Sequence, residues 1–104
     1  MEGSALSLAE RLRLVRGWHP GGFPSVRASL IKHFAKHGAK MDARDLWQYL
    51  RKARTFSMQL KGVQPYLVAG DTPGVLRYRK LGKYIDVAPD GRTVSFGLVS
   101  KNGK

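Results

Sequence analysis

The sequence predicts an α+β fold, in which N-terminal helices pack on one face of a small antiparallel sheet of three to four strands. Apolar residues recur at helical intervals in the first half of the chain, and short β-prone runs separated by turn residues fill the second half. A length of 104 residues allows one domain. We therefore expect a single domain over residues 1–104, helical at about 7–56 and sheet-forming at about 62–100.

The first two helices have clear start signals. Ser7 and Glu10 have the spacing of a capping box, which predicts a helix over residues 8–16. Ser25 follows a proline and opens the second helix, which we expect to end at Gly38. Its predicted apolar stripe consists of Val26, Leu30, Ile31 and Phe34.

A third helix and several strands complete the predicted fold. We expect Asp42 to cap the third helix, which should end near Phe56. Glycine and proline turns then separate four β-prone runs, and the last two of these runs have the pattern of a hairpin. The runs cover residues 62–68, 75–79, 84–87 and 93–99.

The charge indicates what the protein binds. Nineteen Lys and Arg residues against seven Asp and Glu residues give a net charge of +12, which attracts nucleic acid first and anionic membrane surfaces second. The sequence has no apolar run of membrane-spanning length and no signal-peptide pattern, so we expect a soluble chain without a secretion signal of its own. The absence of cysteine excludes disulfides, thiolate catalysis and cysteine-based zinc sites.

Two histidines are candidates for chemistry. His33 and His37 fall on the apolar face of the second helix near its C-terminal end, where the helix dipole favours the imidazolium form, and Lys32, Lys36 and Lys40 flank them. Alternatively, one histidine is a hydrogen-bonded residue at the core edge and the other a solvated surface group. The i, i+4 spacing also suits a zinc pair, but scattered carboxylates cannot complete it, so we predict no metal site.

Histidine among Lys and Arg residues suits RNA cleavage without a metal or another cofactor. The ribose 2′-hydroxyl must lose a proton, cations must hold the phosphorane, and the leaving 5′-oxygen must gain a proton. DNA lacks the 2′-hydroxyl, and metal-dependent DNases usually hold Mg²⁺ with clustered carboxylates. The seven carboxylates show no such cluster in the sequence, so the chemistry, if present, favours RNA.

The predicted sheet offers a cationic face. Alternation places Arg77 and Arg79 on one face and places Thr93 and Ser95 together, whereas Gly97 is expected to serve a turn or bulge. Tyrosines among the cations offer stacking surfaces for unpaired bases. A surface decorated with solubilising charge is the alternative. The candidate RNA-binding residues are Arg77, Arg79, Lys83, Tyr84, Thr93, Lys32 and Lys40.

The order of these motifs resembles the C-terminal toxin domains of bacterial competition systems. More narrowly, it resembles the colicin D-like nucleases of the barnase, EndoU, colicin and RelE group, which includes toxic tips of contact-dependent growth inhibition proteins. The resemblance covers about residues 25–100. The motifs that carry it are Lys32-His33-Phe34-Ala35-Lys36-His37-Gly38, Arg54-Thr55-Phe56, Arg77-Tyr78, Lys83-Tyr84 and Gly91-Arg92-Thr93-Val94-Ser95-Phe96-Gly97.

The resemblance implies a metal-independent RNase that attacks tRNA. Lys36-His37 matches best the Lys-His step that supplies the catalytic histidine of these domains, and Ser95 with the following Phe96 is the nearest equivalent of their active-site serine. His33 leaves open which histidine acts as the base. The resemblance also implies a tightly bound acidic immunity protein, export within a larger protein or particle, and action in the target-cell cytoplasm. We expect a monomer apart from the immunity complex.

The leading interpretation is thus an RNase toxin that cleaves tRNA by 2′-hydroxyl attack and leaves a 2′,3′-cyclic phosphate. The expected catalytic residues are His37, Lys36, His33 and Ser95. The alternative is a non-catalytic RNA- or DNA-binding module, for which charge and aromatic residues suffice. A DNase and a membrane-active basic protein are the other interpretations that the composition permits.

Overall fold

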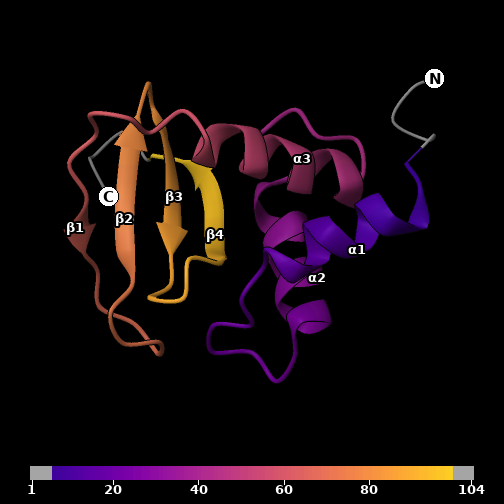
Figure 1. The fold of residues 1–104 in the computed structure, drawn as a ribbon, viewed down its shortest axis with the longest axis horizontal. Coiled ribbons are helices and arrows are strands. Elements are labelled where there is room, and N and C mark those ends of the chain that lie inside the picture. Colours follow the sequence, from indigo (N-terminus) through magenta and orange to yellow (C-terminus); the bar gives the residue numbers. More distant parts are fainter. Residues whose placement is uncertain (1–5, 100–104) are drawn as a thin grey trace.

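Three helices precede four strands along the chain. The structure, a computed structural model, describes residues 6–99, so the predicted sheet end at residue 100 lies outside the described residues. The strands form an antiparallel sheet in the order β1-β2-β3-β4, which confirms the predicted α+β fold (Figure 1). The elements are α1 (Leu8–Arg16), α2 (Val26–His37), α3 (Leu46–Ser57), β1 (Tyr66–Leu67), β2 (Leu76–Lys80), β3 (Lys83–Val87) and β4 (Thr93–Leu98).

Side-chain caps fix the starts of the helices. The Ser7–Glu10 capping box of α1 is confirmed, because each side chain accepts a hydrogen bond from the other residue's backbone N–H. Ser25 caps α2 as predicted by accepting from the backbone N–H of Ala28. The predicted apolar stripe of α2 is wrong at one position, because the Ile31 side chain is 54% exposed.

The predicted cap of α3 is wrong. Asp45, not Asp42, caps the helix, because its Oδ1 accepts a hydrogen bond from the backbone N–H of Gln48. Asp42 has a φ of 60° and lies in the turn between α2 and α3. Aspartate tolerates this left-handed conformation better than most residues do. Either aspartate could cap a helix by its residue type, and the helix begins after Asp45 because Asp42 is used in the turn.

The first strand is much shorter than predicted. Gly62 has a φ of 84°, and the Val63 N–H donates to the Leu60 carbonyl, so residues 60–63 form a turn instead of extended strand. Pro65 then removes one ladder donor. Only Tyr66–Leu67 pairs with β2, at the edge of the sheet.

A β-bulge in β4 overturns a second prediction. Val87 pairs with Thr93 and Asp86 pairs with Ser95, which leaves Val94 as an extra residue in β4. Thr93 and Ser95 therefore lie on opposite faces of the sheet, not together. The backbone of Thr93 instead forms an isolated parallel bridge to Trp18, after the end of α1.

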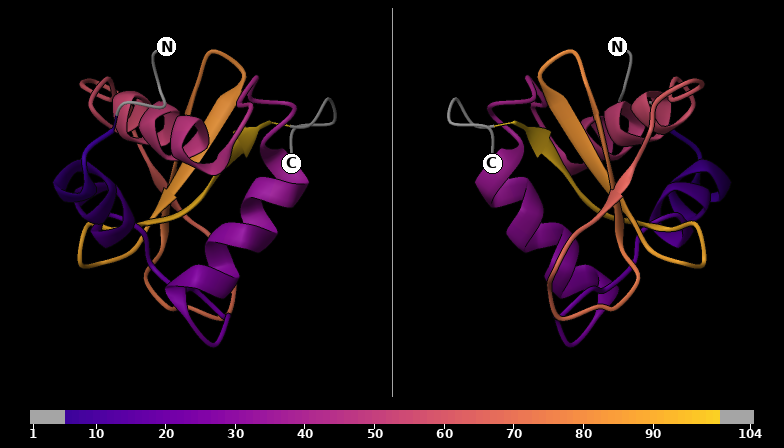
Figure 2. Two further views of the ribbon diagram at one scale, coloured as in Figure 1. Left: turned by 90° about the vertical axis from the view of Figure 1, so that its right-hand side faces the viewer. Right: turned by 90° about the vertical axis from the view of Figure 1, so that its left-hand side faces the viewer.

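The helices divide between the two sides of the sheet, so the prediction that they pack on one face is wrong (Figure 2). Tyr49 and Phe56 of α3 pack against Phe96 of β4 to form the core on one face, and α1 packs on α3. α2 lies on the other side of the strands, next to β4 (Figure 2). None of the helices within residues 6–99 has the length and apolar character to cross a membrane.

Candidate functional site

A cavity of about 430 Å³ lies between the C-terminal half of α2 and the sheet face that α3 does not cover. Loop residues 21–23 and 68–72 complete its walls. We call it the His37 cavity. Seven residues that the sequence singled out line it, and they are Lys32, His33, Lys36, His37, Arg77, Tyr84 and Ser95.

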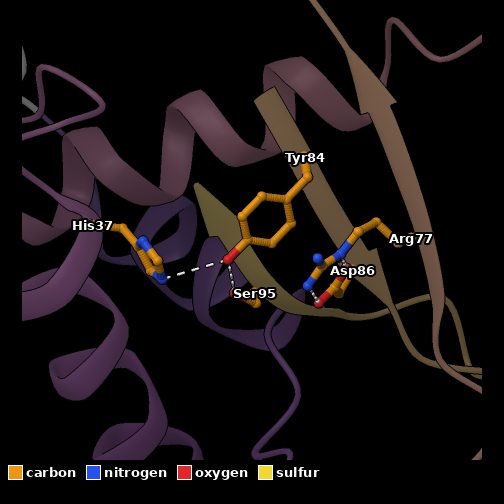
Figure 3. Close-up of polar contacts among 5 residues, drawn as sticks. All are labelled: His37, Arg77, Tyr84, Asp86 and Ser95. Atoms are coloured by element: carbon orange, nitrogen blue, oxygen red, sulfur yellow. Dashed lines mark hydrogen bonds and ion pairs between the residues drawn. The ribbon is translucent and has the colours of Figure 1, made fainter. Parts of the chain in front are cut away.

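A row of polar side chains crosses the floor of the His37 cavity. The Tyr84 hydroxyl lies 3.4 Å from His37 Nε2 and 2.9 Å from Ser95 Oγ, so it bridges α2 and β4 (Figure 3). Tyr84 and Ser95 are buried, and burial raises the pKa of the Tyr84 hydroxyl, which therefore keeps its proton at neutral pH. The contact with His37 is at the long end of hydrogen-bond distances.

Gly97 brings these side chains together. A Cβ atom at this position would lie 2.7 Å from His37 Nδ1 and 3.1 Å from Tyr84 Cε1. The sequence predicted a turn or bulge role for Gly97, but the residue lies within β4, paired with Tyr84. Its function is to let the histidine approach the strand, and a side chain here would displace the ring.

His33 is held behind His37 by contacts that the sequence did not reveal. Its Nδ1 lies 2.8 Å from the carbonyl oxygen of Ser29, which can only accept, so in the neutral ring Nδ1 carries the hydrogen and Nε2 the lone pair. The Trp18 indole N–H donates to the Ser29 hydroxyl at 3.0 Å. The rings of His33 and His37 stack with their centroids 6.1 Å apart.

Burial keeps both imidazoles neutral. Partial burial, with repulsion from His33, Lys36 and Lys40, lowers the pKa of His37 to about 4. Burial likewise lowers the pKa of His33. The expected preference for imidazolium at the end of α2 is overturned, because a helix terminus contributes about 0.3–1 kcal/mol and one pKa unit corresponds to about 1.4 kcal/mol.

Arg77 enters the cavity as half of an ion pair. Its Nε and Nη2 donate to the two carboxylate oxygens of Asp86 at 2.7 and 2.9 Å, and Nη1 is the nitrogen that Asp86 does not engage (Figure 3). The guanidinium carbon lies 4.2 Å from the centre of the Tyr84 ring. Asp86 is 6% exposed, and the sequence did not identify it as a site residue.

Four predicted RNA-binding residues lie outside the His37 cavity. Thr93 is buried on the other face, which contradicts its predicted role beside Ser95. Lys40 is exposed in the turn after α2, Arg79 is exposed on β2, and Lys83 borders a different hollow beside α3.

Within residues 6–99, no group of three or more histidine, aspartate or glutamate side chains lies close enough together to hold a metal ion. Comparisons with protein-family models, curated proteins and solved structures found no match to this chain. The case for function therefore rests on the geometry of the His37 cavity.

Proposed function

We propose that the chain is a metal-independent endoribonuclease toxin that cleaves tRNA or another RNA by 2′-hydroxyl attack. One observation carries the proposal: a neutral His37 lies 3.4 Å from the Tyr84 hydroxyl, which is itself bonded to Ser95, in a cavity lined by Lys32, Lys36 and Arg77. A base, hydroxyl donors and cations are what this reaction needs.

Each group has a role in the proposed reaction. His37 Nε2 takes the proton of the 2′-hydroxyl as the bond from O2′ to phosphorus forms. Arg77 Nη1 and the Tyr84 hydroxyl bind the oxygens of the phosphorane, and Ser95 orients the tyrosine through its 2.9 Å hydrogen bond. The bond from phosphorus to O5′ then breaks, and O5′ takes a proton from the Lys36 ammonium group. The products are a 2′,3′-cyclic phosphate and a 5′-hydroxyl.

The low pKa of His37 has two effects on its role as a base: it keeps the ring unprotonated at neutral pH, and it makes the free ring a weaker base than one with a pKa near 7. A histidine with a pKa of about 4 is unprotonated at neutral pH and is ready to accept a proton. Lys36, which helps to depress that pKa, also lines the cavity, where its positive charge attracts a phosphate. An acidic immunity protein that covers the cavity would silence the enzyme, and we include that partner in the proposal.

The first test is cleavage of tRNA by the purified protein in the presence of EDTA. We expect fragments that end in a 2′,3′-cyclic phosphate, and we expect no cleavage when the reactive nucleotide carries a 2′-deoxyribose. Binding without cleavage would instead identify a non-catalytic RNA-binding module.

His37→Ala supplies the matched variant. We expect it to lower the cleavage rate by about 10²–10⁴-fold, the usual contribution of a positioned base, while RNA affinity changes little. Arg27→Ala is the control, because Arg27 is exposed on the same helix and lies outside the residues that line the His37 cavity. Full activity of His37→Ala would refute the assignment of the base.

A further inference from the structure

A second hollow, of about 610 Å³, lies beside α3 on the other face of the sheet from the His37 cavity. Lys83 and Phe96 border it, whereas their chain neighbours Tyr84 and Ser95 line the His37 cavity, and successive strand residues point to opposite faces. We call it the α3 groove. Its polar lining residues on and next to α3 follow one face of the helix, because each lies three or four positions from another member of the set: Arg44, Gln48, Arg51, Lys52, Thr55 and Gln59.

The α3 groove carries an excess of positive charge. Four cations border it, and a single carboxylate, Asp42, lies with them. Within residues 6–99, none of the four makes an ion pair, whereas Arg77 and Arg92 pair with Asp86 and Asp90. The four cations are Arg44, Arg51, Lys52 and Lys83.

Uncharged groups in the α3 groove add hydrogen-bond donors. The Gln48 side-chain oxygen accepts from the Arg44 N–H at 2.7 Å, so its amide nitrogen remains as a donor. Thr55 and Gln59 lie further along the same face. Cations and amide donors side by side favour phosphate oxygens over bases or apolar ligands.

One turn of chain separates the α3 groove from the His37 cavity. His37 lines the cavity and Met41 lines the groove, and the Met41 N–H donates to the His37 carbonyl at 3.1 Å. Lys40 is exposed on this turn. A nucleic acid strand that leaves the cavity over this turn meets a cation first on the turn and then in the groove.

We propose that the α3 groove is a second binding site for the phosphate backbone of the RNA substrate, outside the reactive nucleotide. The inference rests on the proposed function for the identity of the substrate. The α3 groove then raises the affinity for long RNA and does not change the affinity for a substrate that fills the His37 cavity alone.

Arg51→Gln/Lys52→Gln tests the proposal, since both residues are exposed on α3 and glutamine preserves helix propensity. The probe is a fluorescein-labelled single-stranded RNA of about 12 nucleotides, within the range of single-strand site sizes. Binding is measured by anisotropy in the His37→Ala background, so the result does not depend on cleavage. Because a single-strand phosphate contact contributes about 0.7 to the slope of log affinity against log salt, loss of two contacts should reduce that slope by about 1.4.

Arg16→Gln/Arg27→Gln is the matched control, because both arginines are exposed, helical and outside both hollows. It removes the same net charge and should leave the slope nearly unchanged. In the otherwise unaltered chain, the groove variant should cleave a dinucleoside phosphate at the normal rate and long RNA at a reduced kcat/KM.

Equal loss of RNA affinity in the groove and control variants would overturn the proposal, because it would show that only total charge matters. Unchanged RNA affinity in the groove variant would also overturn it, including the case in which that variant loses affinity for an acidic protein instead. If the chain cleaves no RNA, the proposed function fails while the anisotropy result still decides whether the groove binds RNA.

Discussion

His37 is the last residue of α2, and its half-buried side chain lies against β4. Lys36 and Lys40 are near it, and His33 stacks on its ring. Burial and each of these neighbours disfavour a positive charge on the His37 ring. A bound phosphate has the opposite effect, because its negative charge favours the imidazolium. The residue therefore becomes a stronger base when the proposed substrate arrives, without any movement of the chain.

The low pKa of His37 makes its titration a direct test of the site geometry. We expect the imidazole NMR signals of His37 to titrate with a midpoint near 4. Since the folded pKa lies below the unfolded value of about 6.5, neutral His37 contributes its full stability above that pH, and the contribution is lost as the pH falls toward 4.

The stability advantage of the wild-type chain over His37→Gln should therefore shrink between about pH 6.5 and pH 4, which urea unfolding at several pH values measures. The control is the same series of unfolding curves for Gly17→Ala, which changes no titratable group, so its effect on stability should not depend on pH. A His37 midpoint near its ordinary value would contradict both the partial burial and the cationic surroundings described above.

At the scale of elements, β4 matters most to the site. The Val94 bulge turns Ser95 toward Tyr84 and leaves Thr93 on the core side, while Gly97 makes room for the end of α2. Three successive positions of β4 thus have three different roles. Ser95 supplies a hydroxyl group, Gly97 leaves space for His37, and Phe96 between them is 1% exposed and packs in the core.

Gly97→Ala should separate α2 from β4. The added methyl group would lie 2.7 Å from His37 Nδ1, so the ring must move. Because misplacement by about 1 Å can cost roughly 10²-fold in rate, we expect RNA cleavage to fall by about that factor while the strand itself tolerates alanine.

Gly17→Ala is the control, since its Cβ would meet only ordinary contacts, the nearest at 3.4 Å. Cleavage assays, paired with urea unfolding of each variant, distinguish a displaced histidine from a damaged fold. A Gly97→Ala protein that is as active as the wild type would show that the close approach is unimportant.

The sequence predicted features that depend on neighbours along the chain. The Ser7 and Ser25 caps and the placement of both histidines on α2 follow from local spacing. Features that depend on pairing across the sheet were missed: the bulge at Val94 breaks the alternation from which a shared face was inferred, and the contact between Gly97 and His37 joins residues far apart in sequence. No pattern along the chain contains that information.

At the scale of the whole molecule, positive charge surrounds hollows on both sides of the sheet. Lys32, Lys36 and Arg77 line the His37 cavity together with Asp71 and with Asp86, the partner of Arg77. The α3 groove has four further cations and one carboxylate, Asp42. A net charge of +12 promotes fast association with polyanions and makes that association sensitive to salt. An inhibitor that covers the His37 cavity would compete directly with the reactive nucleotide of the proposed substrate.

We therefore expect expression of the chain to arrest growth of a bacterium unless an acidic partner is expressed with it, for example from a neighbouring gene. The partner should bind over the His37 cavity and prevent RNA cleavage. Lys32→Glu/Lys36→Glu should weaken that complex by at least tenfold through charge reversal, and calorimetry of the purified proteins measures the change.

Arg16→Glu/Arg27→Glu, which reverses two exposed charges outside both hollows, should leave the affinity for the partner within a few-fold. Harmless expression without any partner would count against a toxin, and a complex that still cleaves RNA at the free enzyme's rate would show that the partner binds elsewhere.

The position of β4 in the chain has a consequence during protein synthesis. It is the last of the helices and strands in residues 6–99 to leave the ribosome, yet it supplies Ser95, Phe96 and Gly97. Until it emerges, the aromatic core on α3 lacks Phe96, and Tyr84 lacks its hydroxyl partner. A nascent chain therefore carries both histidines without the complete His37 cavity. On the proposed function, this order would spare the ribosome and the tRNA bound to it until β4 has emerged.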